Sequence, residues 1–419
     1  MKQAGQDSSE RPISPYRQTI LGMMLLFLPC AVYYLWFCLD RNRGAPIWPS
    51  ISLLQDIPRP TWTSAVIVVG WLTFQALLQI YGPGRWVEGA ALADGVRLRY
   101  RMNGWFAWWF TWATVVIGVA VGLISPTFLA DQFGPLLTVT NIAAFLFSFC
   151  LYWHGKGFGR RKERIRGQVV SDFWFGTTLN PRVGRFDLKL FCEARPGLIA
   201  WVLIDLSFAA KQRELHGSVT TPMILICLFQ FWYVADYFLH EEAILSTWDI
   251  RHENFGWMLC WGDLVWLPFT YSIQANYLVN NLHDLPWWGI VCIVLLNLCG
   301  YVIFRGANIQ KHQFRKNPAL PIWGRQPVYI DTSQGSFLLA SGWWGLARHM
   351  NYLGDVLMGL AWCLTCLFGS PLPYSYFVYF VVLLVHRERR DNSLCAARYG
   401  TAWDAYCRKV PYRIIPRLY

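Results

Sequence analysis

The chain has 419 residues, of which 55% are hydrophobic and only 15% are charged. A soluble domain usually carries about 25% charged residues. The apolar residues collect in long continuous runs, and runs of about 20 residues match the hydrocarbon thickness of a bilayer at helical rise. Because these runs do not alternate, they also argue against a membrane barrel. The composition therefore excludes a soluble globular domain and predicts an all-α polytopic membrane protein.

We predict ten transmembrane helices, near residues 20–39, 62–81, 105–124, 134–153, 197–210, 222–240, 256–280, 287–304, 353–369 and 371–386. The first predicted helix follows a polar tail (1–19). Charged residues follow this helix where a signal peptide would have its cleavage site, so we predict that the helix is a retained anchor. Helices 1–4 occupy residues 20–153, and a basic cytosolic loop covers 154–196. We expect residues 197–419 to form the catalytic region, with long cytosolic segments at 305–352 and 386–419.

The positive charges predict the orientation of these helices. All but five of the 37 Lys and Arg residues fall on the side that holds both predicted termini. Such an excess marks the cytosolic side, in an endoplasmic reticulum membrane or a bacterial inner membrane alike. The densest cluster, Lys156 to Arg166, is expected to contact anionic membrane lipids. No base-reading aromatic residues surround it, so we predict no nucleic-acid partner.

The sixth predicted helix carries a polar stripe. Gln230, Tyr233, Tyr237 and Glu241 recur at helical spacing, and Asp236 and His240 adjoin them. A polar group at membrane depth must face protein or a water-filled cavity. Each residue alone could simply hydrogen-bond to a neighbouring helix, but six on one stripe favour a polar cavity.

Three cytosolic segments combine basic and aromatic residues. Lys311 and Arg315 are four residues apart and share a helical face, and Arg348 and His349 follow two tryptophans. In the C-terminal tail, a helical arrangement puts four residues on one face, with Tyr406 two turns later: Asp391, Cys395, Arg398 and Tyr399. Arginine binds phosphate bidentately, so the pattern suits a phosphorylated aromatic ligand. A juxtamembrane basic belt is the alternative.

Two other kinds of site are not predicted. The glycines of GKGFGR (155–160) follow no strand, so a Rossmann dinucleotide fingerprint is absent. The set His240, Glu241, Asp249 and His252 fits no established ligand spacing, and we predict no metal site. Any dinucleotide would have to be held by the membrane fold itself.

Four long stretches resemble one known family: DLKLFCEARPGLIAWVLIDLSFAAKQRELHG (187–217), WDIRHENFGWMLCWGDLVWLPFTYSIQANYL (248–278), LLASGWWGLARHMNYLGD (338–355) and HRERRDNSLCAARYGTAWDAYCRKVPYRIIPRLY (386–419). They are similar to the integral-membrane sterol reductases, which include the sterol Δ14-reductases, the membrane region of lamin B receptor and 7-dehydrocholesterol reductase. The resemblance covers roughly residues 145–419.

This resemblance implies that the chain reduces a ring carbon–carbon double bond of a sterol, drawn from the bilayer, with NADPH. The implied nucleotide contacts are Lys311, Arg315, Leu339, Trp344, Asn351, Tyr352, Asp391, Cys395, Ala396, Ala397, Arg398, Tyr399 and Tyr406. The stretch EEAILSTWDI (241–250) favours the C14=C15 bond, whereas GWMLCWGDLVWLP (256–268) looks more like the Δ7 enzyme.

An isolated alkene has no adjacent carbonyl to accept electrons, so an acid must protonate it before hydride adds. We expect the donor to be Tyr233 or Glu241 on the stripe, or Asp391 at the end of the last helix. A membrane transporter is the main non-enzyme alternative. It would predict inverted repeats or paired broken helices, and the sequence shows neither.

Overall fold

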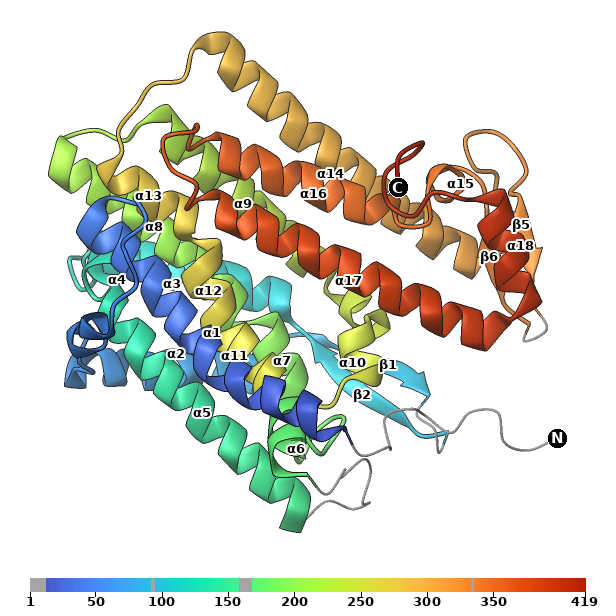
Figure 1. Cartoon of the computed structure of the whole chain (residues 1–419), viewed down its shortest axis with the longest axis horizontal. Helices are drawn as coiled ribbons and strands as arrows, with labels where there is room; N and C mark the ends of the chain where they lie inside the picture. The colour runs from blue at the N-terminus through green and yellow to red at the C-terminus, as the bar shows by residue number, and fades with distance from the viewer. Residues whose placement is uncertain (1–12, 92–94, 158–167, 333–334) are drawn as a thin grey trace. The chain divides into compact units, whose positions relative to one another are not determined.

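The computed structural model describes residues 13–91, 95–157, 168–332 and 335–419. The chain divides into two compact units, residues 1–282 and 283–419, and each is described by itself. Most elements in both are helices (Figure 1). Residues 158–167, which hold most of the predicted lipid-contacting cluster, and residues 1–12 of the polar tail lie outside the described parts.

The first half of unit 1 contains four long apolar helices. They are α1 (Pro15–Asn42), α2 (Trp62–Tyr81), α3 (Gly104–Ala120) and α5 (Phe133–Gly157), joined by the short helices η2 (Ile51–Asp56) and α4 (Phe128–Asp131). Local sequence explains where they begin: Pro15 opens α1, and Thr61 and Ser64 form a reciprocal capping box on α2. All four coincide with predicted helices.

The second half of unit 1 begins with short elements that the predicted loop at 154–196 did not include. Helices α6 (Val169–Phe175) and α7 (Leu188–Ala194) precede α8 (Pro196–His216) and α9 (Thr221–Leu239), and η3 (Glu241–Ser246) and α10 (Trp248–His252) follow. Proline opens both α8 and α9, and Gly217 ends α8 in a left-handed conformation.

The seventh predicted helix is not continuous. Residues 256–280 form α11 (Trp257–Trp261), a π-helical turn η4 (Gly262–Trp266), α12 (Leu267–Tyr271) and α13 (Ile273–Asn280). Pro268 lacks the N–H that an uninterrupted helix would need there, which explains the break. Gly197 of α8 lies directly against the Asp263 carbonyl, where any Cβ would collide. π-Turns of this kind occur often at functional sites.

Three small hairpins correct the all-α prediction. Strands β1 (Arg85–Ala91) and β2 (Arg97–Met102) pair antiparallel, with Arg85 opposite Met102 and a bulge between Glu88 and Ala91. The pairs β3 (Arg182–Val183) with β4 (Phe186–Asp187) and β5 (Tyr329–Asp331) with β6 (Phe337–Leu339) are shorter. They carry too few residues to give a readable alternation of polar and apolar side chains.

Unit 2 is built on three helices: α14 (Trp287–Lys316), α16 (Met350–Leu364) and α17 (Tyr374–Tyr399). Two short helices, α15 (Trp343–Leu346) and α18 (Thr401–Lys409), flank them. As expected from Pro371 and Pro373, α17 begins at Tyr374. Helices α14 and α16 approach closely because Gly300 packs on the backbone of Gly354, leaving no room for a Cβ on either residue.

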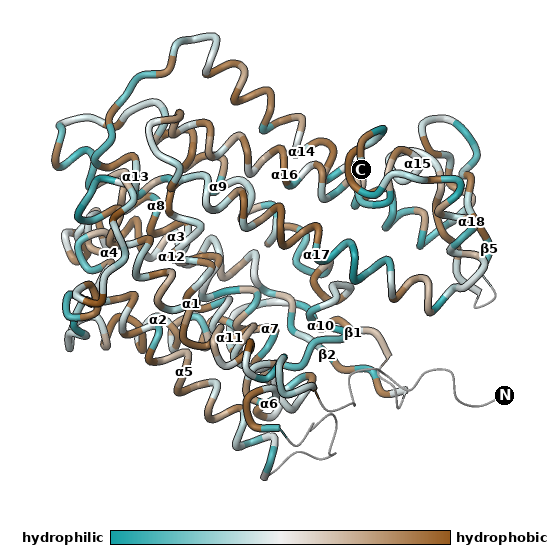
Figure 2. Tube along the Cα trace, in the orientation of Figure 1, coloured by the Kyte–Doolittle hydropathy of each residue, from teal (hydrophilic) through white to brown (hydrophobic). Residues whose placement is uncertain are grey.

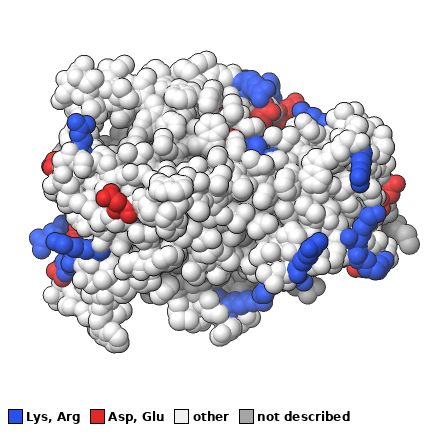
Figure 3. Space-filling model, turned by 90° about the horizontal axis from the view of Figure 1, so that it is seen from above, with Lys and Arg blue, Asp and Glu red and all other residues white. Residues whose placement is uncertain are grey.

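The helices have the properties of membrane spans. Among the described residues, five are long and apolar enough to cross a bilayer: α1, α2, α5, α9 and α14. Large apolar side chains such as Leu26 and Phe27 are 74% and 65% exposed, as expected of a lipid-facing surface. Charged residues are sparse on the face in Figure 3.

Figure 2 shows α17 turning from apolar to polar along its length. Helix α17 ends at Tyr399 and therefore extends beyond the predicted span at 371–386.

Candidate functional site

In unit 2, Lys311 and Trp344 form a cation–aromatic pair. The Lys311 ammonium lies 4.0 Å from the centre of the Trp344 ring, within the range of a cation–π contact. The buried indole is fixed because its Nε1 donates to the Ala307 carbonyl at 2.8 Å. Tyr406 of α18 donates to the Trp344 carbonyl at 3.4 Å. The structure thus brings together predicted contacts from three separate segments.

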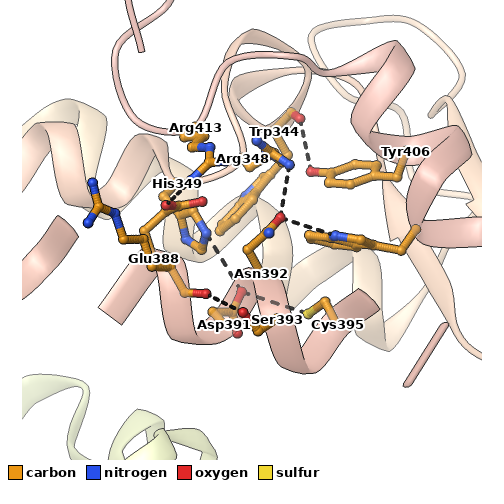
Figure 4. Close-up of polar contacts among 12 residues, drawn as sticks. Trp344, Arg348, His349, Glu388, Asp391, Asn392, Ser393, Cys395, Tyr406 and Arg413 are labelled. Atoms are coloured by element: carbon orange, nitrogen blue, oxygen red, sulfur yellow. Dashed lines mark hydrogen bonds and ion pairs between the residues drawn. The ribbon is translucent and has the colours of Figure 1, made fainter. Parts of the chain in front are cut away.

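A second group of predicted residues surrounds His349. The imidazole stacks on Tyr352, with ring centres 4.8 Å apart, and its Nε2 lies 3.6 Å from Asp391 Oδ2 (Figure 4). Burial and the positive charges of Lys311 and Arg348 lower the pKa of His349 to about 3. The imidazole is therefore neutral at physiological pH. The predicted contacts did not include His349, although its place beside Arg348 after two tryptophans was a usable signal.

The last turns of α17 carry the other predicted contacts of the C-terminal tail. Cys395 Sγ lies 3.8 Å from Asp391 Oδ2, and burial together with that carboxylate raises the pKa of Cys395 to about 12. It therefore remains a thiol. Tyr399 is half-buried, whereas the surface of this turn exposes Ala396, Ala397 and Arg398.

Arg348, also outside the predicted contacts, ties the segments of unit 2 together. Its guanidinium donates to Asn392 Oδ1 of α17 at 3.2 Å and to Cys407 Sγ of α18 at 2.7 Å. Asn392 also accepts from Trp403 Nε1 at 3.2 Å (Figure 4). One buried arginine therefore fixes α17 against α18, a role that spacing in the sequence does not reveal.

The C-terminal segment is fastened to the start of α16. The backbone N–H groups of Arg348 and His349 donate to the carbonyls of Tyr412 and Arg413, at 3.0 and 2.8 Å. Arg413 forms an ion pair with the fully buried Glu388 of α17 at 3.1 Å. These contacts hold the basic–aromatic residues in one fixed arrangement.

The remaining predicted contacts lie on the same elements. Leu339 is buried on β6 and packs in one apolar cluster with Trp344. Asn351 is the second residue of α16, and its buried Oδ1 has no hydrogen-bond partner among the described residues. Arg315 is exposed one turn after Lys311 on α14. All the predicted nucleotide contacts thus lie on elements of unit 2, and direct contacts join Trp344 with Lys311, Leu339 and Tyr406, and Asp391 with Cys395.

In unit 1, the polar stripe on α9 faces protein, as expected. Gln230 is fully buried, accepts from Trp201 Nε1 at 3.2 Å and donates to the Tyr271 carbonyl at 3.1 Å. Tyr233 is half-buried and its ring lies 6.2 Å from that of Trp201. Asp236 and His240 contact each other at 3.3 Å. For Gln230, Asp236 and His240, therefore, contacts with neighbouring residues are enough to explain a polar side chain on this helix.

Glu241 belongs to a buried network. Its Oε2 accepts from the Gly104 N–H at 2.8 Å and its Oε1 from the guanidinium of Arg195 at 3.2 Å. Arg195 also donates to Asn103 Oδ1. Burial raises the pKa of Glu241, but both of its oxygens accept hydrogen bonds, and such bonds are strongest to an ionised carboxylate. The residue is better suited to holding Arg195 than to donating a proton.

Sequence reasoning missed an acid beside this network. Glu193 of α7 has a buried Oε1 with no hydrogen-bond partner among the described residues. Burial raises the pKa of Glu193 well above its ordinary value, and the nearby charges of Asp263 and Asp249 raise it further. Lys189, one turn earlier, is fully buried and donates to three backbone carbonyls at 2.7 to 3.0 Å. Only the quoted stretch 187–217 pointed to this region.

The described residues include no group of three or more His, Cys, Asp or Glu side chains placed to hold a metal ion. The four residues weighed as a metal set, His240, Glu241, Asp249 and His252, have other contacts. His240 bonds to Asp236 and Glu241 to Arg195, and the His252 ring stacks on Trp248 with centres 4.3 Å apart.

Together the long apolar helices and the basic–aromatic site define an integral-membrane α-helical protein with a site suited to an anionic, aromatic ligand. The chain belongs to the ergosterol biosynthesis ERG4/ERG24 family, whose model matches residues 23–419. The family match therefore includes the N-terminal helices, beyond the stretch at 145–419 from which the resemblance was drawn.

Three relatives show how close this similarity is. The chain is 55% identical to a Delta(14)-sterol reductase of Methylotuvimicrobium alcaliphilum, over 95% of this chain and 94% of that protein. It is 45% identical to a Delta(14)-sterol reductase of Dictyostelium discoideum, over 95% and 91%. It is 39% identical to 7-dehydrocholesterol reductase of Xenopus laevis, over 94% and 91%.

Proposed function

We propose that this protein is a sterol reductase that reduces the C14=C15 double bond of a sterol with NADPH. The observation that carries the proposal is the 55% identity, over 95% of the chain, to a protein named Delta(14)-sterol reductase. The Δ7 alternative is supported by 39% identity over a similar share of the chain. The higher identity favours the C14=C15 bond.

The residues of unit 2 fit NADPH. Lys311, Arg315 and Arg398 supply positive charge for its phosphates, and the stacked rings of His349 and Tyr352 offer a flat face. The buried Asn351 Oδ1, without a protein partner among the described residues, suits a donor on the ligand. Leu339, Trp344, Asp391, Cys395, Ala396, Ala397, Tyr399 and Tyr406 complete the proposed contacts. The nucleotide, when bound, supplies the hydride.

The protein's own acids must supply the proton. Tyr233 on α9 is the donor that we propose in unit 1, since a half-buried phenol is neutral and has a proton to give. Asp391 is the alternative donor in unit 2, where it also contacts His349. Glu241, both of whose oxygens accept hydrogen bonds, is proposed to position Arg195. If Tyr233→Phe and Asp391→Asn both keep full turnover with nucleotide bound, the donor assignment is wrong.

The proposed orientation places both termini in the cytosol and keeps ten membrane spans, in an endoplasmic reticulum or bacterial inner membrane. It is supported by the charge distribution, with all but five Lys and Arg residues on one side. Protease digestion of terminal tags in sealed vesicles tests it: tags cleaved only from the non-cytosolic side would contradict it.

The nucleotide proposal is tested by binding NADPH to the purified protein and following the quenching of tryptophan fluorescence. Arg315→Met should weaken NADPH binding by about 10- to 100-fold, because a charged hydrogen bond to phosphate contributes ~1.5–3 kcal/mol. If Arg315 contacts the 2′-phosphate, NADH binding should change little. The matched control is Lys316→Met, an exposed cation one position along the same helix. Equal losses in both variants would contradict a specific phosphate contact.

A further inference from the structure

The proposed reaction consumes one proton in each turnover, so its donor must be reprotonated before the next. A donor on the buried face of α9 cannot exchange freely with bulk water. Unit 1 also holds three residues with buried polar atoms that the mechanism above does not use as acids: Glu193, Arg195 and Tyr237. Among the described residues, Glu193 Oε1, the Tyr237 hydroxyl and two Arg195 nitrogens (Nε and Nη1) have no hydrogen-bond partner.

These groups belong to one cluster. The Tyr237 hydroxyl interacts electrostatically with Glu193, Glu241 and Arg195. Its ring packs on the apolar cluster that includes Leu190 and Ala194, the α7 residues on either side of Glu193. Leaving buried polar atoms unpaired costs about 1–3 kcal/mol each. A cluster of several such atoms therefore points to a function rather than to packing.

Tyr237 also connects this cluster to the proposed donor. Tyr233 and Tyr237 are four residues apart on α9, so their side chains lie on the same face one turn apart. Glu193 is the one acid of the cluster whose burial favours the protonated form and whose Oε1 is not engaged by the described residues. The arrangement thus places an acid whose burial favours the protonated form in one cluster with a phenol that lies one turn after the proposed donor on the same face of α9.

We infer that Glu193 and Tyr237 form a proton relay that reloads Tyr233 after each turnover. The inference rests on the proposed function and adds a path for the proton. Arg195, whose Nη2 is held by Glu241 and Asn103, presents its other nitrogens to stabilise the transient phenolate of Tyr237.

The proton balance of each turnover is as follows. The O–H bond of Tyr233 breaks as the alkene π electrons form a new C–H bond, and a bound NADPH would supply the hydride that the resulting carbocation needs. Because neither the Tyr237 hydroxyl nor Glu193 Oε1 is hydrogen-bonded to a described residue, each transfer passes through an intervening water molecule. Through water, the Tyr233 phenolate takes a proton that Tyr237 gives up, and the Tyr237 phenolate takes a proton that Glu193 gives up. The Glu193 carboxylate is finally reprotonated from solvent.

A relay residue can be distinguished from a direct donor by comparing the first turnover with later ones. In Glu193→Gln and in Tyr237→Phe, Tyr233 still begins protonated, so enzyme in excess over sterol should form product at the wild-type rate. With sterol in excess, the steady-state rate should fall on the order of 100-fold, the usual effect of losing a proton-transfer group. The matched control is Glu242→Gln, a half-buried carboxylate paired with Arg85 at the surface.

Either of two results would overturn the relay: an unchanged steady-state rate in Glu193→Gln, or a first turnover slowed as much as later ones. Melting temperatures equal to that of the wild type verify that the variants fold. A second measurement needs no turnover. Infrared difference spectra should contain the carbonyl band of a protonated carboxylic acid at neutral pH, absent from Glu193→Gln. If wild type forms no reduced sterol, the proposed function fails, whereas the band still decides whether Glu193 stores a proton.

Discussion

Two buried cations, Lys189 in unit 1 and Arg348 in unit 2, are each held by several hydrogen bonds rather than by a single opposite charge. The ammonium of Lys189 donates to the carbonyls of Asp249, Ile250 and Glu253. Arg348 donates to an amide, a thiol and a backbone carbonyl. Because a buried charge without such partners is very costly, these residues fix the local backbone. They position the acids of unit 1 and the basic–aromatic site of unit 2.

At the residue scale, His349 predicts how the stability of unit 2 depends on pH. The groups that face it are Lys311 of α14, the neighbouring Arg348, Tyr352 of α16 and Asp391 of α17. Its pKa is about 3 in the folded protein and about 6.5 when unfolded. The unfolded chain therefore binds more protons between these values, and stability falls as the pH drops below 6.5, by at most ~1.4 kcal/mol per unit.

Thermal unfolding of the purified protein between pH 7 and pH 4.5 measures this slope. His349→Gln, which cannot titrate, should flatten it, while His386→Gln on the more exposed part of α17 should not. An unchanged slope in His349→Gln would show that the imidazole is not held neutral by its surroundings.

At the element scale, the two main helices of unit 2 are joined through small residues. A Cβ at Gly354 of α16 would lie 2.5 Å from the Phe304 amide nitrogen of α14, far inside van der Waals contact. Close backbone approach through glycine is a common way for membrane helices to pack. Lys311 lies near the C-terminal end of α14. The packing of α14 against α16 therefore also fixes the position of the proposed phosphate contacts.

Gly354→Leu should therefore separate α14 from α16, lower the melting temperature and weaken NADPH binding. Overpacking a tight core costs ~1–3 kcal/mol, and a backbone collision puts this substitution at the upper end. The control is Gly70→Leu on α2, because a Cβ added at Gly70 would meet no atom within 4 Å. Equal melting temperatures for both variants would contradict the close packing.

How far the elements could be predicted depends on their length. Long apolar runs gave the positions of α1, α2, α5 and α14 because hydropathy over about 20 residues averages out local exceptions. The π-turn at Gly262–Trp266 was not predicted, because one proline within an apolar run leaves the hydropathy unchanged. The hairpins were missed because strands of two to seven residues show too little alternation.

At the scale of the whole molecule, sequence reasoning located the basic–aromatic segments but not what holds them. The spacing of four residues was enough to predict that Lys311 and Arg315 lie on the same face of one helix. The contact of Arg348 with Cys407 joins residues 59 positions apart, and that of Arg195 with Glu241 joins residues 46 apart. Such pairings depend on the tertiary fold. For the same reason Glu193, isolated in a short helix, gave no sign of its electrostatic surroundings.

The central claim is that this membrane protein uses NADPH to reduce the C14=C15 bond of a sterol. The most direct test incubates the purified protein with NADPH and either a Δ8,14-sterol or a Δ7-sterol, and identifies the products by mass spectrometry. We predict a product two hydrogens heavier from the Δ8,14-sterol, with stoichiometric oxidation of NADPH. Reduction of the Δ7-sterol alone, or of neither sterol, would contradict the claim.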